Sequence, residues 1–493
     1  MLKRLIGGCA AALLAANATA APSILAPPSP PGAAVRPYVR MSDRQVVLRH
    51  VRIIDGTGAP AQADRTIVLE DGKIAAVGPA TMATPKGATV LDLAGYTVLP
   101  GLVGMHDHMY YIARPNYDAA GHSEPPLVVP QMTFTSPRLY LAAGVTTMRT
   151  TGSVEPYADL NVKSLIDAGA MPGPHMDVTA PYLEGKGSPF IQMHQLKDAE
   201  DARRMVNFWA DQGATSFKAY MNITRAELGA AIDEAHKRDL KVTGHLCSVT
   251  YPEAAELGID NLEHGFFVNT QLDPGKQPDV CPQTTGAPTL LTMTPDSTRG
   301  DDLIKLLVER KVAVTSTLPV FEQSVAGHAP LNPRAMAVLT PQAREAYLFA
   351  RNLRNAPPRE QFEDTAKGFR NAMALERKFV AAGGLLIAGP DPTGNGGVIP
   401  GFGDQREVEL LVEAGFTPEQ AIRIATLNGA TYLGLADRIG SIAPGKNADL
   451  MVVKGDPSKT IADIENVEIV FKDAVGYDAA KLLESVKGRY GQY

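Results

Sequence analysis

The alternation of apolar and polar residues changes along the chain and predicts two kinds of structure. Residues 45–58 (QVVLRHVRIIDGTG) and 65–80 (RTIVLEDGKIAAVGPA) alternate the two classes over short β-branched runs, with Gly and Asp between the runs. A period of two is typical of strands and hairpins that are buried on one face. We therefore expect residues 43–95 to form a small β unit.

From residue 96 the pattern becomes a repeat of short apolar runs and longer amphipathic segments. The clearest amphipathic segments, 197–213 and 224–239, carry apolar residues three and four positions apart and are predicted to be helices. Because strands that alternate with helices pair in parallel, and because there are eight of them, the pattern favours a closed (β/α)8 TIM barrel of class α/β over residues 96–435. The eight predicted strands lie in residues 96–108, 145–150, 175–180, 214–220, 241–246, 260–265, 312–318 and 385–391.

Strand character returns within residues 436–493. Because this β unit and the one at 43–95 are both small, we expect them to pair into one composite β-sandwich outside the barrel. Two stretches, 266–310 and 319–375, are too long for simple barrel connections. They are expected to carry lids or extra helices over the barrel mouth.

Residues 1–20 have the pattern of a secretory signal peptide. Two basic residues precede an apolar stretch too short to cross a bilayer, and Ala18 and Ala20 form an A-x-A cleavage pattern. Residues 21–42 are rich in Pro and Ala and are expected to form an extended leader. The sequence thus predicts an exported protein, periplasmic or secreted, with no membrane segment after cleavage.

Composition limits the remaining functions. The chain has 493 residues, 45% of them hydrophobic, which is enough for a large core. A net charge of -6 gives no support for nucleic-acid binding, so small-molecule substrates are expected, and a homo-oligomer is compatible with the sequence. After removal of the signal, Cys247 and Cys281 remain, and the sequence leaves open whether they form a disulfide.

His106 and His108 flank a single aspartate at the end of the first predicted barrel strand. Side chains alternate along a strand, so the two imidazoles share a face and point into the barrel. Active sites of such barrels lie at the C-terminal ends of the strands, where both histidines are placed. Taken alone, two hydrogen-bonded histidines at a strand end would explain the motif as well.

Further residues of metal-ligand type lie at the ends of other predicted strands: His245, His264 and Asp391. Imidazoles and carboxylates are ligands that zinc and similar metals use, so their convergence favours a metal centre. Lys218 ends the fourth strand, where burial would lower its pKa. A neutral amine can react with carbon dioxide, and the resulting carbamate can bridge two metals; a lysine paired with a carboxylate is the alternative.

The chain resembles the amidohydrolase superfamily over most of its length. The resemblance rests on HDH at 106–108, FKAY with Lys218, GHL with His245, EHG with His264 and GPD with Asp391. It implies a distorted barrel with a composite β-sandwich and two divalent metal ions, most commonly Zn2+. It also implies that His106, His108 and Asp391 hold the more buried metal, that His245 and His264 hold the other, and that N6-carboxylated Lys218 bridges them. Asp391 would also be the catalytic residue that moves the proton.

Within the superfamily, Lys218 and the spacing of the two later histidines resemble the branch of Xaa-Pro dipeptidases, N-acyl amino acid hydrolases and ochratoxin-hydrolysing amidohydrolases. Cys247 and Thr150 stand where His or Tyr and Asp are common in that branch, and they leave the substrate class open. The resemblance implies hydrolysis of peptide-like or N-acyl amino acid amides by a hydroxide that bridges the metals. A lactonase or esterase on the same centre, or a mononuclear cyclic-amide hydrolase or deaminase, is the alternative. A barrel that only binds a ligand would be expected to have lost ligands, and all six are present.

Three tyrosines lie at or just past predicted strand ends and are candidate substrate contacts through their hydroxyls: Tyr110, Tyr182 and Tyr220. Aromatic packing around the barrel mouth is the alternative role. Four other histidines have no partner in the pattern and are expected to face solvent or to support the ligands: His122, His175, His194 and His328.

Overall fold

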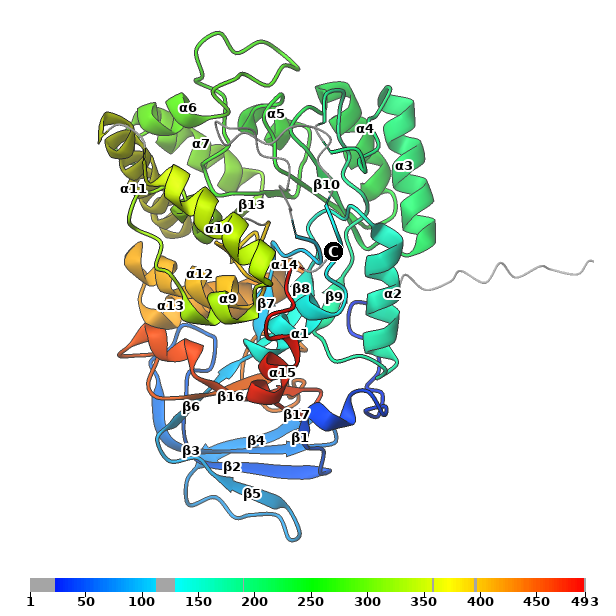
Figure 1. Cartoon of the computed structure of the whole chain (residues 1–493), viewed down its shortest axis with the longest axis vertical. Coiled ribbons are helices and arrows are strands. Elements are labelled where there is room, and N and C mark those ends of the chain that lie inside the picture. The colour runs from blue at the N-terminus through cyan, green and yellow to red at the C-terminus, as the bar shows by residue number, and fades with distance from the viewer. Residues whose placement is uncertain (1–22, 112–128, 189, 357–358, 394–396, 492–493) are drawn as a thin grey trace, which may run out of the picture.

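The computed structural model describes residues 23–111, 129–188, 190–356, 359–393 and 397–491. The predicted signal peptide and His122 lie outside these residues. The fold is mixed α/β, with a large sheet at one end and parallel strands surrounded by helices at the other (Figure 1). In the described part of the chain no helix is long and apolar enough to cross a membrane.

The two ends of the chain pair with each other in one nine-stranded sheet. The strand order is β1-β17-β16-β15-β6-β2-β3-β4, with β5 beside β2. β15 runs antiparallel to β6, with Val452 opposite Val98. The sandwich and the domain boundaries expected from the sequence stay predictions. The strands of this sheet are β1 (Val39–Met41), β2 (Gln45–Ile53), β3 (Gln62–Glu70), β4 (Lys73–Pro79), β5 (Thr89–Asp92), β6 (Tyr96–Pro100), β15 (Leu450–Lys454), β16 (Val467–Lys472) and β17 (Val475–Asp478).

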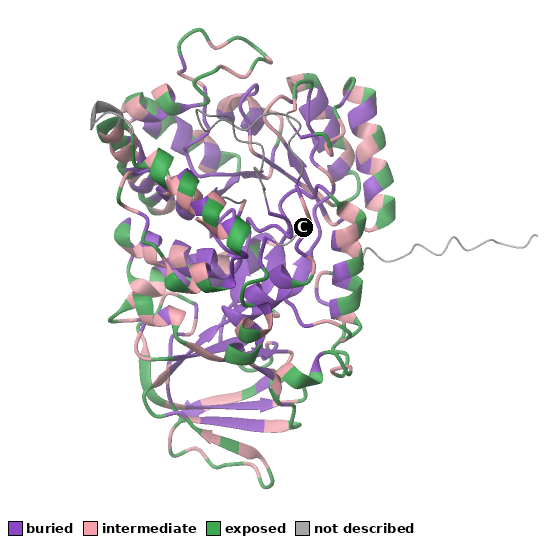
Figure 2. Ribbon diagram, viewed as in Figure 1, coloured by how far each residue is buried: buried purple, intermediate pink, exposed green. Residues whose placement is uncertain are grey.

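Alternation along β15 explains how this sheet is held. Val452 packs in an apolar cluster that belongs to the sheet itself. Its neighbours Met451 and Val453 face the other way and belong to the large apolar cluster around the parallel strands. All three side chains are fully buried, so β15 is apolar on both faces up to Val453, before the exposed Lys454 ends it. The sheet is therefore packed on both faces at β15, whereas Figure 2 shows exposed residues at the ends of other strands of the large sheet.

Each of the eight stretches predicted as barrel strands contains a strand. They form a three-stranded and a five-stranded sheet, and all of their pairings are parallel. A parallel bridge between Thr179 and Ser216 links the two sheets on one side, and the Met105 N–H donates to the Ala388 carbonyl on the other. The strands are β7 (Leu102–Gly104), β8 (Val145–Arg149), β9 (His175–Asp177), β10 (Ser216–Ala219), β11 (Lys241–Gly244), β12 (Asn261–Leu262), β13 (Ala313–Ser316) and β14 (Leu386–Ala388).

Helices follow the strands, and their ends are fixed by local residues. At the start of α4, the Thr224 hydroxyl accepts from the Glu227 N–H and the Glu227 carboxylate accepts from the Thr224 N–H, a reciprocal capping box. At the end of α3, Gly213 takes the left-handed conformation that ends helices, with φ of 104°. These helices are α1 (Thr135–Ala142), α2 (Pro156–Asp167), α3 (Ala199–Gln212), α4 (Arg225–His236), α5 (Tyr251–Glu256), α12 (Phe402–Glu413), α13 (Pro418–Arg423), α14 (Gly429–Tyr432) and α15 (Ala479–Val486).

The two long stretches carry extra helices, whereas the lid expected there stays a prediction. The helices in and beside them are α6 (Ala287–Thr292), α7 (Thr298–Glu309), α8 (Leu318–Glu322), α9 (Pro333–Val338), α10 (Pro341–Arg354) and α11 (Arg359–Ala381). Short turns of other helix types lie at Arg36–Tyr38, Ile424–Asn428 and Ile461–Glu465. A disulfide joins Cys247 to Cys281, and so connects the loop after β11 to the segment between β12 and α6.

The buried carboxyl of Glu376, on α11, makes the free energy of unfolding depend on pH. Burial raises the pKa of Glu376 to about 8, although its Oε2 accepts a hydrogen bond of 2.8 Å from Ser316. In the unfolded chain a Glu pKa is about 4.3. The folded state therefore keeps a proton that the unfolded state releases, and this contribution to stability is present below pH ~4.3 and is lost as pH rises towards 8.

We predict that Glu376→Gln, which replaces the protonated acid by a neutral amide, makes the melting temperature fall less between pH 5 and pH 8. Thermal unfolding followed by circular dichroism measures this. Glu345→Gln, at an exposed position on α10, is the matched control and should keep the wild-type slope. Parallel curves for wild type and Glu376→Gln would contradict the assignment.

Candidate metal centre

The six predicted ligands all line one cavity of about 260 Å3 at the C-terminal ends of the parallel strands. His106 and His108 follow β7, Lys218 lies within β10, and the other three follow β11, β12 and β14. Five of the six side chains are buried, and His245 is partly exposed to the cavity. The structure therefore brings together residues that are separated by up to 285 positions in the sequence.

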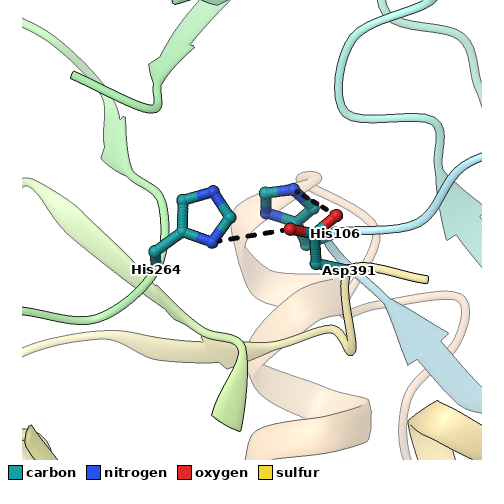
Figure 3. Close-up of side chains that lie close together, drawn as sticks. All are labelled: His106, His264 and Asp391. Atoms are coloured by element: carbon teal, nitrogen blue, oxygen red, sulfur yellow. Dashed lines mark ion pairs between the residues drawn. The ribbon is translucent and has the colours of Figure 1, made fainter. Parts of the chain in front are cut away.

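Asp391 lies among the histidines. Its Oδ1 is 3.2 Å from His108 Nε2 and 3.6 Å from His106 Nε2. Its Oδ2 is 3.9 Å from His264 Nδ1, and Figure 3 shows the rings of His106 and His264 turned towards the carboxylate. One donor atom from each of His106, His264 and Asp391 falls within 4.8 Å of the others. This spacing suits a metal ion.

The donor atoms that face the cavity include buried ones without a hydrogen bond. His264 Nε2 and Asp391 Oδ1 are buried and have no hydrogen-bond partner. Leaving such atoms buried and unpaired is costly, unless a cation takes the place of the missing partner. The donor set of imidazole nitrogens and a carboxylate fits a divalent transition metal such as zinc.

Lys218 lies beside these ligands with an altered protonation equilibrium. Its side chain is 1% exposed, and Nζ lies 3.1 Å from His106 Nε2. Burial lowers the pKa of Lys218 to about 8. Among the residues that the structure describes, it forms no ion pair of the kind that the alternative role requires. Roughly a tenth of the amine is therefore neutral at pH 7, and only this form reacts with carbon dioxide.

Glu263 orients His106 by contacting the ring nitrogen that faces away from the cavity. Its Oε2 is 2.7 Å from His106 Nδ1, and its Oε1 accepts from Arg149 Nη2 at 2.7 Å and from Thr243 Oγ1. Arg149 also donates to the Met105 carbonyl. Burial alone would raise the pKa of Glu263, but Arg149 and His106 hold it well below its usual value. The ionised carboxylate fixes Nδ1 of His106 as a donor and leaves Nε2 facing the cavity.

The other histidines are oriented by different partners. His108 Nδ1 lies 3.0 Å from the Thr150 carbonyl oxygen, so this nitrogen is the donor and Nε2 faces Asp391. His264 Nδ1 lies 2.9 Å from Thr317 Oγ1. Thr150, which departs from the resembled branch, thus holds His108 through its backbone.

The backbone leaves its regular strand conformation at two of the ligands. His264 has φ of 69° and Asp391 has φ of 54°, values in the left-handed region that non-glycine residues seldom adopt. Strained residues of this kind cluster at functional sites. The turn at His264 ends the alternation of β12, so Glu263 and His264 both reach the same centre although they are adjacent in sequence.

The three predicted tyrosines line the wall of the cavity. Tyr110 and Tyr182 share a hydrogen bond of 2.6 Å between their hydroxyls, and the Tyr110 ring stacks on His108 with centroids 4.4 Å apart. The ring of Tyr220 lies between those of Tyr182 and His245, with centroid distances of 4.8 Å to Tyr182 and 5.0 Å to His245. Burial raises the pKa values of Tyr110 and Tyr182 well above 10, so both hydroxyls stay protonated. One of the two protons lies in the hydrogen bond between them, which leaves the other hydroxyl free to donate.

Comparisons with known proteins show which families the chain is similar to. Residues 391–476 match the model of the amidohydrolase family. Enamidase from Eubacterium barkeri is 25% identical over 433 residues, which cover 84% of this chain and 89% of the enzyme. Imidazolonepropionase from Porphyromonas gingivalis is 38% identical over 95 residues, or 18% of this chain, and the match spans only 21% of that enzyme.

Two solved structures share the fold. An Xaa-Pro dipeptidase with bound methionine in its active site has a TM-score of 0.64 and 20% identity, over 88% of this chain and 100% of that one. The A. niger ochratoxinase has a TM-score of 0.60 and 17% identity, and the match covers 87% of this chain and 94% of the ochratoxinase chain. The chain is thus similar to the amidohydrolase family over residues 391–476, and to an enamidase over most of its length.

Two functional residues of the centre were not found from the sequence, Glu263 and Arg149. Strand alternation places Glu263 and His264 on opposite faces, so the choice of His264 as a ligand turned attention away from Glu263. The left-handed backbone at His264 is what lets both residues reach the centre. Arg149 lies in VTTMRT, but nothing in that motif shows which carboxylate it meets.

We predict that Glu263→Gln weakens metal binding about 10- to 100-fold, because the amide cannot hold the donor tautomer of His106 as a carboxylate does. Titration of the metal-free protein with zinc in competition with a chelator measures the affinity. Glu256→Gln, at an exposed position on α5, is the matched control. Equal affinities for Glu263→Gln and wild type would show that the carboxylate has no orienting role.

Proposed function

We propose that the protein is an exported, binuclear metal-dependent amidohydrolase that cleaves C–N bonds of peptide-like or N-acyl amino acid amides. The observation that carries the proposal is the convergence of six metal-ligand residues on one cavity. We also propose that the two parallel sheets close into a distorted (β/α)8 barrel and that the chain ends form the composite sandwich. The bridge at Thr179 and the hydrogen bond from Met105 support this closure.

The residues suited to hold two metal ions fall into two groups around Lys218. His106, His108 and Asp391 would hold one ion, His245 and His264 the other, and N6-carboxylated Lys218 both. The ions, which we expect to be zinc, would acidify a water molecule and polarise the scissile carbonyl. The lowered pKa of Lys218 supports the carbamate, because the amine must lose its proton before it reacts.

Asp391 is the residue placed to move the proton. Burial would raise the pKa of its carboxyl, but the facing His106 and His108 hold it below its usual value. The carboxylate is therefore ionised at neutral pH and can accept the proton of the attacking water. Passing that proton to the leaving nitrogen completes the cleavage of the C–N bond.

The wall of the cavity favours substrates with an apolar group beside the scissile bond. Apart from the ligands and tyrosines, its described lining is mostly apolar and includes Val129, Val154, Phe190 and Phe321. The hydroxyls of Tyr110 and Tyr182 line the same cavity and share one hydrogen bond. The hydroxyl whose proton is not used in that bond can donate to a carbonyl or carboxylate of the substrate.

We predict that Lys218→Ala loses most of its bound metal and at least 100-fold of its hydrolytic rate, because the two ions lose their shared ligand. Metal content per chain, measured by mass spectrometry after loading in bicarbonate with limited zinc, should fall from about two in the wild type. Lys237→Ala, an exposed lysine after α4, is the matched control. Full metal content and rate in Lys218→Ala would exclude the carbamate, and one metal in the wild type would favour the mononuclear hydrolase or deaminase.

Substrates decide between an amidase and an esterase on this centre. A panel of N-acyl amino acids and dipeptides, each paired with the ester or lactone of the same acyl group, should show the higher kcat/KM for amides with apolar side chains. The Tyr110→Phe variant should raise KM for these amides and leave the metal content unchanged. A preference for lactones throughout the panel would favour the lactonase alternative.

A further inference from the structure

A second group of metal-ligand side chains lies at the opposite end of the parallel strands from the centre. His175 begins β9, Asp449 immediately precedes β15, and Asp473 lies in the turn between β16 and β17. The sequence pattern assigns no partner to His175, because Asp449 and Asp473 lie 274 and 298 positions later in the chain. The structure corrects this, since one donor atom from each residue lies within 4.8 Å of the others.

All three side chains are nearly or fully removed from solvent. The His175 and Asp449 side chains are each 2% exposed, and that of Asp473 is 10% exposed. Both ring nitrogens of His175 and Oδ2 of Asp449 are buried without a hydrogen-bond partner. The other oxygen of Asp449 is used, because it accepts the Asp473 N–H at 2.8 Å. The unpaired atoms of this group therefore face one another.

The distances match those between ligands of one cation. His175 Nε2 lies 3.3 Å from Asp473 Oδ2 and 3.8 Å from Asp449 Oδ2. Ligand atoms about 2.0–2.2 Å from a tetrahedral zinc ion lie roughly 3.3–3.6 Å apart. The distance from His175 to Asp473 already matches this spacing, and that from His175 to Asp449 exceeds it by about 0.2 Å.

The charges around His175, Asp449 and Asp473 favour a bound cation. Two carboxylates, from Asp449 and Asp473, lie beside one imidazole, and a bound cation would balance their charge. Lys472 lines the same small cavity and compensates part of this charge. The cavity has a volume of about 30 Å3, enough for one water molecule, and residues 26–29 of the leader cover it.

We propose that His175, Asp449 and Asp473 bind a divalent transition-metal ion, with one water molecule as the fourth ligand. The site would be structural, because its three side chains are almost fully buried and residues 26–29 line the small cavity beside it. It ties the first residue of β9 to two strands of the nine-stranded sheet. The proposal does not depend on the hydrolytic reaction, and its test uses metal content and diffraction.

Zinc counted per chain tests the site. The stripped full-length protein is dialysed against zinc, and the content is measured by mass spectrometry for wild type, Asp473→Asn and His175→Gln. We expect both variants to bind one zinc ion fewer per chain than wild type. Asp239→Asn is the matched control, because Asp239 is exposed and has the same left-handed backbone as Asp473, with φ of 56° against 52°.

The same count in a His106→Ala background separates this site from the catalytic centre. Adding Asp473→Asn to His106→Ala should remove one further zinc ion, whatever the catalytic centre still holds. An unchanged count on adding Asp473→Asn in both backgrounds would overturn the proposal. If the variants fail to fold, anomalous diffraction from zinc-loaded wild-type crystals decides, with a peak among the three side chains expected and its absence overturning the site.

Discussion

The ion pair between Glu263 and Arg149 is the interaction on which the metal centre depends. Both side chains are almost completely buried, and Nη2 of Arg149 lies 2.7 Å from the carboxylate. Removing one partner of a buried pair leaves an uncompensated charge, which costs about 3–5 kcal/mol. The pair also holds strands together, since Arg149 ends β8, bonds to the Met105 carbonyl after β7, and reaches Asn261 in β12. The pair between Glu263 and Arg149 therefore both orients His106 and holds β7, β8 and β12 close together.

Much of this arrangement could be predicted from the sequence, because alternation and strand order are local properties. His106 and His108 lie two residues apart, so a strand places them on one face whatever surrounds it. Glu263 could not be found in this way, because alternation places it on the face opposite to His264, and no residue pattern indicates the left-handed turn at His264 that brings both to the centre. Asp391 also has a left-handed backbone, so its position at a strand end was predictable but its direction was not.

Contacts between distant parts of the chain were the least predictable. The disulfide from Cys247 to Cys281 was left open, because its geometry depends on how the segment after β12 folds back. His175 had no assigned role, because Asp449 and Asp473 become its neighbours only when the C-terminal strands pack beneath β9. The pairing of the chain ends was predictable only as a way to complete two β units too small to stand alone.

The pairing of β6 with β15 also has a consequence for the order of folding. The two strands are joined by some 350 residues of intervening chain, so their contact carries a high loop-closure entropy. Strands β2 to β6 emerge early in synthesis with the edge of β6 unsatisfied, and this edge is covered only when the last residues are available. A nascent chain therefore exposes an apolar sheet edge for most of its synthesis, which is a target for chaperones and a route to aggregation.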